Sequence, residues 1–88
     1  MNRDVAIVIF NYNKNNKREE VDLELSLDIT ANELFVALNS AYELGVDVSD
    51  IKSCYLKAEN PVVLLKGNKT LREYGIRNGS IIHFNIEE

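Results

Sequence analysis

The side chains most capable of chemistry in this 88-residue chain are its one cysteine, Cys54, and its one histidine, His83. A nucleophilic Cys–His pair requires the two side chains to lie within hydrogen-bond distance of each other. Cys54 shares the apolar phase of its predicted strand with Leu56, whereas His83 is out of phase with the apolar Phe84. The two side chains should therefore lie on opposite sides of a sheet, and Cys54 is interpreted as a small core residue rather than a nucleophile.

Metal, carboxylate and phosphate chemistry receive little support from the sequence. A metal site needs several Cys, His or carboxylate ligands at short spacing, and the chain has no such motif. Glu19 and Glu20 follow Lys17-Arg18, a mixed-charge group that is typical of a solvated loop. Gly75 and Gly79 lie in turn sequences that precede no predicted helix, so no phosphate-binding loop is expected. The sequence predicts a protein that is not an enzyme, with no cofactor and no metal.

Composition and charge limit the class of protein further. A 10.0 kDa chain can hold one small domain, spanning residues 1–88, and 45% hydrophobic residues supply its core. Ten basic against fourteen acidic residues argue against nucleic-acid binding, which normally uses a basic patch. The longest apolar run, Val5–Phe10, is too short for a membrane helix or a signal peptide. One cysteine forms no internal disulfide, so we expect a cytoplasmic protein without membrane insertion.

Five segments have the character of β-strands. The second alternates apolar and polar residues with a period of two, and the others are short runs rich in β-branched, aromatic or alternating apolar residues. A polar hairpin loop, residues 11–16, is predicted to join the first two strands. The predicted strands are Val5–Phe10, Val21–Asp28, Cys54–Ala58, Val62–Leu65 and Ser80–Ile86.

One amphipathic helix is predicted from about Ala31 to Leu44. Thr30 and Glu33 form a capping box at its start, and Gly45 can close its end. The order β-β-α-β-β-β predicts an α+β fold, a β-grasp in which a mixed sheet wraps across the single helix. The predicted core consists of Val5, Ile7, Ile9, Val21, Leu23, Leu25, Leu34, Leu38, Ala41, Leu56, Leu71, Ile82 and Phe84.

Residues 70–76, Thr-Leu-Arg-Glu-Tyr-Gly-Ile, resemble the Thr-Leu-x-Asp/Glu-Tyr-x-Ile segment that precedes the last strand of ubiquitin-like proteins. The Asn11-Tyr12-Asn13 segment and the pattern Leu71-x-x-Tyr74-Gly75-Ile76-x-Asn78-Gly79 are similar to the YukD/EsaB family. This resemblance implies a single ubiquitin-like domain that serves as an accessory protein of Gram-positive type VII (WXG100, ESX-like) secretion systems. It implies no chemical activity.

The C-terminus differs from that of ubiquitin and of sulfur-carrier proteins, which act through a terminal Gly-Gly. This sequence ends in Ile86-Glu87-Glu88, and bulky acidic side chains do not suit the narrow channel through which such a tail is activated. We therefore expect a non-catalytic adaptor that works by protein–protein docking and not by conjugation. The alternatives are a ubiquitin-like docking domain of a larger protein and, disfavoured by the tail, a modifier or sulfur carrier.

The outward face of the sheet is the candidate binding site. If Ile7 points to the helix, its neighbours on the first strand point away from it, together with alternate residues of the third and last strands. The resemblance to ubiquitin-like proteins also implies that His83 occupies the position at which those proteins have a histidine in their hydrophobic recognition patch. The expected partner is a protein, the cytosolic part of a type VII membrane component; a weak homodimer and an apolar surface without a partner stay open. The candidate residues are Val8, Phe10, Tyr55, Ile81 and His83.

Overall fold

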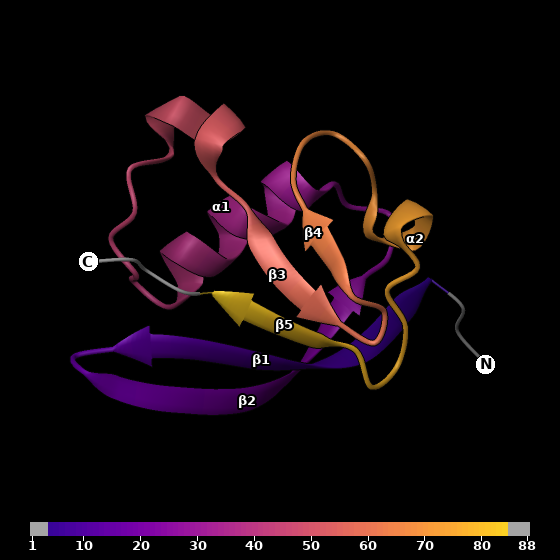
Figure 1. Ribbon diagram of the computed structural model, residues 1–88, viewed down its shortest axis with the longest axis horizontal. Coiled ribbons are helices and arrows are strands. Elements are labelled where there is room, and N and C mark those ends of the chain that lie inside the picture. Colours follow the sequence, from indigo (N-terminus) through magenta and orange to yellow (C-terminus); the bar gives the residue numbers. More distant parts are fainter. Residues whose placement is uncertain (1–3, 85–88) are drawn as a thin grey trace.

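One helix packs on one face of a five-stranded mixed sheet in the computed structural model, which describes residues 4–84 (Figure 1). The strand order is β2-β1-β5-β3-β4, with β1 parallel to β5 and all other neighbours antiparallel. The predicted α+β plan is confirmed. The elements are β1 (Val5–Lys14), β2 (Lys17–Ser26), α1 (Ala31–Ala41), the 3-10 helix η1 (Val48–Ser53), β3 (Leu56–Glu59), β4 (Val63–Leu65), α2 (Leu71–Tyr74) and β5 (Ile81–Phe84).

The first hairpin is longer and tighter than predicted. Residues 11–14 continue β1 instead of forming a loop, and the turn consists of Asn15 and Asn16 alone, with φ of 55° and 64°. A two-residue turn with both φ values positive suits the twist of the flanking strands, and asparagine tolerates this region better than most residues. The turn sets the register, in which Phe10 pairs with Val21.

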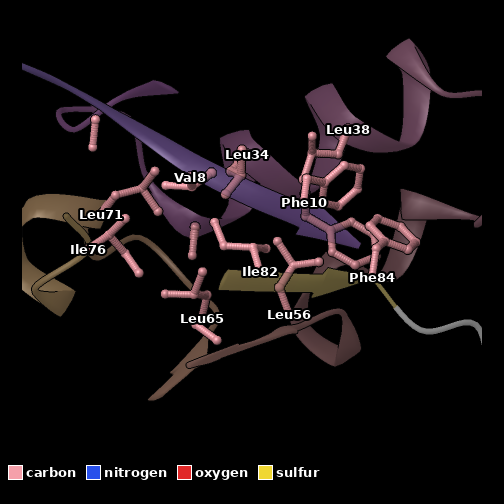
Figure 2. Close-up of a cluster of buried hydrophobic side chains, with 14 of the residues drawn as sticks. Val8, Phe10, Leu34, Leu38, Leu56, Leu65, Leu71, Ile76, Ile82 and Phe84 are labelled. Atoms are coloured by element: carbon pink, nitrogen blue, oxygen red, sulfur yellow. The ribbon is translucent and has the colours of Figure 1, made fainter. Parts of the chain in front are cut away.

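This register shows that the predicted orientation of β1 was wrong. Residues paired across antiparallel strands share a face, and Val21 packs against the core, so Phe10 and Val8 point inward as well. Both are fully buried (Figure 2). Ile7 points the other way and is 54% exposed. Of the predicted core residues, Ile7 and Ala41 are exposed, and Val5 and Ile9 are only half-buried.

Helix α1 begins at the predicted capping box but ends before Leu44. The N–H of Leu44 donates to the carbonyl of Asn39 at 3.0 Å, and the residue directly before Leu44, Glu43, has a φ of 53°. This is a Schellman arrangement with Glu43 in the left-handed position that the sequence suggested for Gly45. The early end leaves residues 48–53 to form η1, a helix that was not predicted from the sequence.

The core lies between α1 and the inward side of the sheet. The ring of Phe84 stacks on Phe35 at a centroid distance of 4.6 Å and meets Phe10 edge-on at 6.4 Å. Val21, Leu23 and Leu25 of the edge strand β2 are half-buried against it, as members of the predicted core. The predicted core positions that are buried are Leu34, Leu38, Leu56, Leu71, Ile82 and Phe84 (Figure 2).

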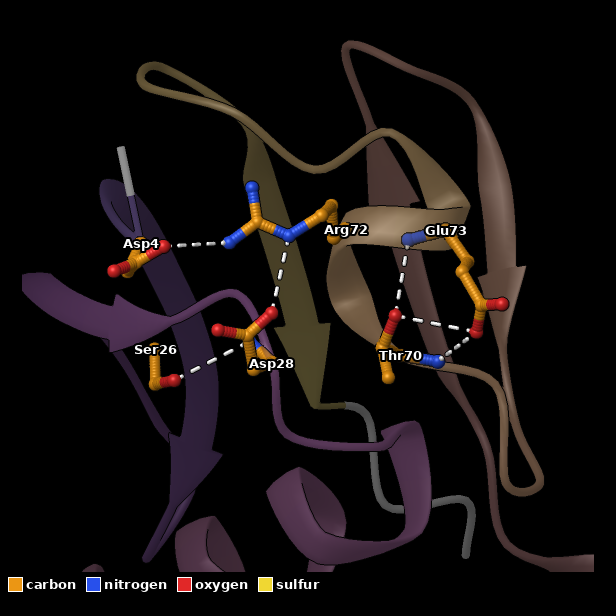
Figure 3. Close-up of polar contacts among 6 residues, drawn as sticks. All are labelled: Asp4, Ser26, Asp28, Thr70, Arg72 and Glu73. Atoms are coloured by element: carbon orange, nitrogen blue, oxygen red, sulfur yellow. Dashed lines mark hydrogen bonds and ion pairs between the residues drawn. The ribbon is translucent and has the colours of Figure 1, made fainter.

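The short helix α2 closes one end of this core. Leu71 is fully buried, and a capping box around Thr70 begins the helix, as its sequence indicates. Arg72 points the other way and joins the ends of β1 and β2 (Figure 3). Its Nη2 donates to Asp4 at 3.1 Å and its Nε to Asp28 at 3.0 Å. Hydrogen bonding and charge from Asp28 raise the pKa of Arg72 above its already high ordinary value, so the guanidinium keeps its positive charge.

Candidate protein-binding face

The side of the sheet opposite α1 carries the candidate site. Residues that pair with one another on neighbouring strands place their side chains on the same side of the sheet, in two rows: the first crosses three strands and the second crosses four. One row runs from Ile9 through Ile81 to Glu59, and the other runs from Asn11 through His83 and Lys57 to Leu64. We define the outer face as Ile7, Ile9, Lys57, Glu59, Val62, Leu64, Ile81 and His83.

The structure supports the predicted orientation of some candidate residues and overturns that of others. Ile81 and His83 lie on the outer face, both half-buried. Tyr55 precedes β3 and is exposed. Val8 and Phe10 were predicted to point outward, but they are core residues on the other side of β1 and cannot contact a partner in the folded chain.

The most exposed apolar members of the outer face were not predicted from the sequence. Ile7 was assigned to the core, and Val62 and Leu64 were given no role. Val62 is 86% exposed and Leu64 46% exposed. Both belong to a continuous apolar run, Val62–Leu65, whose two faces look alike in sequence, and only pairing with β3 distinguishes them: Leu64 opposes the outward Lys57.

His83 is held in one orientation by its neighbours. Its Nε2 lies 2.6 Å from a carboxylate oxygen of Glu59, and its Nδ1 lies 3.5 Å from the amide nitrogen of Asn11. A ring with the proton on Nε2 satisfies both contacts, since Nε2 then donates to Glu59 and Nδ1 accepts from Asn11. His83 therefore acts as a fixed, flat part of the face between β1 and β3.

An open groove of about 460 Å³ lies beside His83, over β3 and β4. Lys57 and Glu59 form its polar border, and Val62 and Leu64 form its apolar part. Sites for small molecules are usually deep enough to bury most of the ligand surface. An open, mostly apolar groove suits side chains from the surface of a partner protein better.

Cys54 lies away from the outer face and packs against the core, in agreement with its predicted role. Burial and the nearby carboxylate of Asp50 raise the pKa of its thiol. A thiol with a raised pKa carries little thiolate at neutral pH and is a poor nucleophile. Within residues 4–84, no three His, Cys, Asp or Glu side chains are grouped so that they could hold a metal ion. No helix in this part of the chain is long and apolar enough to cross a membrane.

The family profile described as "WXG100 protein secretion system (Wss), protein YukD" matches residues 4–84, nearly the whole chain. The chain belongs to the YukD family. The description of this family names a secretion system. The expected resemblance is confirmed.

Solved structures place this YukD-family chain in the ubiquitin-like fold. The C-terminal ubiquitin-like domain of mouse tubulin-specific chaperone e is 14% identical with a TM-score of 0.70, covering 97% of this chain and 89% of that one. A ubiquitin-like domain from tubulin-binding cofactor B is 21% identical with a TM-score of 0.66, covering 93% and 89%. At such identities the likeness shows the fold alone. No curated protein sequence is significantly similar to this chain.

Proposed function

We propose that this YukD-family protein is a non-catalytic adaptor whose outer face binds the cytosolic part of a membrane component of the WXG100 secretion system. The observation that carries the proposal is the uncovered side of the sheet. Helix α1 covers one side, where Val8 is fully buried, while Ile7 on the next position of the same strand is 54% exposed. The difference in exposure between these adjacent residues arises because α1 covers one side of the sheet and no helix within residues 4–84 covers the other (Figure 1).

The chemistry of the outer face suits a protein partner. Monomeric proteins rarely expose a large group of apolar side chains, and such a group surrounded by polar residues usually marks an interaction site. Here Ile7, Val62 and Leu64 supply the exposed apolar area, and Lys57 and Glu59 supply charged groups among them. An apolar centre with a polar border is the usual arrangement of a protein interface.

The fixed orientation of His83 and the regular spacing of the strands favour a rigid docking surface. Side chains that are already ordered lose less conformational entropy when a partner binds. The contacts of His83 with Glu59 and Asn11 restrain three side chains before any partner arrives. No mobile element is required for this mode of binding.

The direct test removes apolar area from the outer face without adding charge. In the double variant Ile7→Thr/Leu64→Thr, threonine retains strand propensity while shortening both exposed side chains. The matched control is Val36→Thr, because Val36 is exposed to a similar extent, 43%, on α1. In cells that produce the secretion system, we expect the double variant to lower export of WXG100 substrates by about tenfold, the size typical for removal of interface anchors. The control should export normally at equal protein abundance.

A photo-crosslinking amino acid placed at position 7 identifies the partner directly. We expect ultraviolet light to join it to a membrane component of the secretion system, and the same amino acid at position 36 to give no such product. Crosslinks from position 36 alone, or normal export by the double variant, would show that the outer face is not the functional surface.

A further inference from the structure

Three carboxylates lie in a line beside the apolar part of the outer face. Glu20, Asp22 and Glu24 are alternate residues of β2, and all three are exposed. We name them the acidic row. They point to the same side of the sheet as Ile7 and Ile9, because Glu24 pairs with Ile7 and Asp22 with Ile9 across the antiparallel β1–β2 ladder.

Within residues 4–84, no ion pair involves a member of the acidic row, and the only basic residue next to it on the same side of β2 is Arg18, which precedes Glu20 in the alternation. The cross-strand neighbours of its three members are Asn11, Ile9 and Ile7, which carry no charge. The ion pairs among residues 4–84 join other side chains: Lys14 with Glu43, Arg72 with Asp4 and Asp28, and His83 with Glu59. Like charges along one strand repel each other weakly, and a cationic ligand would relieve this repulsion.

The acidic row and the apolar side chains of β1 form two parallel lines. Neighbouring strands are about 4.8 Å apart, and alternate residues along a strand repeat about every 6.8 Å. The three carboxylates therefore extend over about 14 Å beside Ile7, Ile9 and Asn11. A complementary ligand needs a basic line of this length, with apolar side chains at its flank where Ile7 and Ile9 lie.

We propose that the occupant of the outer face is a basic amphipathic helix of the partner protein, lying along β1 and β2 with its lysine or arginine side chains over the acidic row. Two turns of helix rise about 11 Å, and residues at i, i+4 and i+8 repeat about every 6 Å along one flank. Long basic side chains cover the small difference from the strand spacing. This inference rests on the proposed docking function and specifies the chemistry of the partner.

Charge also argues against other occupants. The phosphates of nucleic acids and of anionic lipid surfaces are repelled by the acidic row. A second copy of this chain carries the same acidic row and a formal net charge of −4, so pairing two outer faces brings like charges together. A basic protein segment is attracted from a distance as well as in contact, which raises its association rate at low salt.

Two charge reversals on the same strand isolate the acidic row. Asp22→Lys changes its central residue, whereas Glu19→Lys makes the same change on the opposite side of β2, where Glu19 pairs with Tyr12. Both residues are exposed, so both variants should keep the fold. The probes are two synthetic 16-residue helical peptides, each with a leucine stripe, flanked by lysine in one and by glutamate in the other.

Nuclear magnetic resonance titration of the ¹⁵N-labelled chain provides the readout. We expect the leucine–lysine peptide to shift the amide signals of Ile7, Ile9 and Ile81, with binding that weakens as salt rises. Asp22→Lys should weaken this binding at least about tenfold and Glu19→Lys less than about twofold. The leucine–glutamate peptide should not bind.

Several results would overturn the inference. They are equal binding of the two peptides, no binding of either, tight binding retained by Asp22→Lys, or shifts confined to the β3–β4 groove. Self-association of the chain in sedimentation, abolished by Ile7→Thr, would replace the helix with a second copy. The export assay distinguishes this proposal from the proposed docking function. If Ile7→Thr/Leu64→Thr blocks export and Asp22→Lys does not, the outer face is still the docking surface, but its ligand is not a basic helix.

Discussion

Thr30 and Thr70, the N-cap residues of the two α-helices, are paired with each other in an isolated antiparallel bridge. The N–H of Ala31 donates to the carbonyl of Lys69, and the N–H of Leu71 donates to the carbonyl of Ile29, each at 3.0 Å. Each threonine also accepts, at its hydroxyl, the N–H of a glutamate three residues later, at 3.1 Å in both helices. The two helix starts are thus held together by backbone bonds and share one local structure.

The first prediction concerns the two caps. Thr30→Ala and Thr70→Ala should each lower the free energy of unfolding by about 1 kcal/mol, the usual loss for an N-cap hydroxyl. Because the two residues are paired, the double variant should differ from the sum of the single ones by about 0.5 kcal/mol or more. Urea denaturation measures all three. Thr30→Ser and Thr70→Ser serve as controls and should retain most of the stability, since serine keeps the hydroxyl; strict additivity would contradict the coupling.

The second prediction concerns the acid side of the stability curve. Hydrogen bonds from the backbone N–H and hydroxyl of Thr70 hold the pKa of Glu73 below its ordinary value of 4.5. The folded state therefore binds fewer protons at Glu73 than the unfolded state. The resulting stabilisation is complete above the ordinary value and is lost as the pH falls through the folded pKa.

Glu73→Gln removes this titration while keeping an oxygen that can accept the same bonds. Between about pH 6 and about pH 3, the stability of the natural chain should decrease more steeply than that of Glu73→Gln. Urea midpoints across this range measure the difference. Asp47, whose pKa is also lowered, titrates in both proteins and cancels in the comparison. Parallel curves for the two proteins would refute the role of Glu73.

Helix starts were predictable from the sequence because they depend on residues within one turn. Thr30 with Glu33 and Thr70 with Glu73 are complete capping boxes in sequence and in structure. The end of α1 was not predictable in the same way, because a glutamate, Glu43, adopts the left-handed conformation for which glycine is the usual residue.

The orientation of β1 could not be read from β1 itself. All six residues of Val5–Phe10 are apolar, so neither side of the strand is marked as outward. The information lies in its partner: β2 alternates clearly, and a two-residue turn at Asn15-Asn16 pairs Val21 with Phe10. When residues 11–16 are taken as a six-residue loop, the pairing of β1 with β2 is no longer fixed. The outward residues of β1 were therefore predicted wrongly. His83 was placed correctly because its strand alternates with buried Ile82.

The third prediction tests the orientation of β1 with the same substitution at adjacent positions. Val8→Thr puts a hydroxyl into the core, and burying it without a partner should cost about 1–3 kcal/mol. Ile7→Thr exchanges an exposed side chain for another strand-forming residue and should cost less than about 1 kcal/mol. Guanidinium denaturation of both variants provides the comparison. A larger loss for Ile7→Thr than for Val8→Thr would reverse the assignment of the two faces.

The fourth prediction concerns α1. Leu38 is buried against the sheet, so Leu38→Ala should lower the free energy of unfolding by about 2–5 kcal/mol through lost burial and a residual cavity. Val36→Ala, on the exposed side of the same helix, is the control and should change stability by less than about 0.5 kcal/mol, since alanine favours the helix. Chemical denaturation distinguishes these values readily. A loss below about 1 kcal/mol for Leu38→Ala would be incompatible with its buried position.

The fifth prediction concerns the turn that sets the β1–β2 register. Asn16 has a φ of 64°, a conformation that costs an ordinary side chain about 1–2 kcal/mol but costs glycine little. Asn16→Gly should therefore keep or slightly raise stability, and Asn16→Val should lower it by about 1–2 kcal/mol. Asn13→Val is the matched control, because Asn13 is an exposed residue within β1, where a β-branched side chain is favoured. Thermal unfolding of the three variants measures the order: if Asn16→Val is as stable as Asn13→Val, the turn does not require the left-handed conformation and does not fix the register.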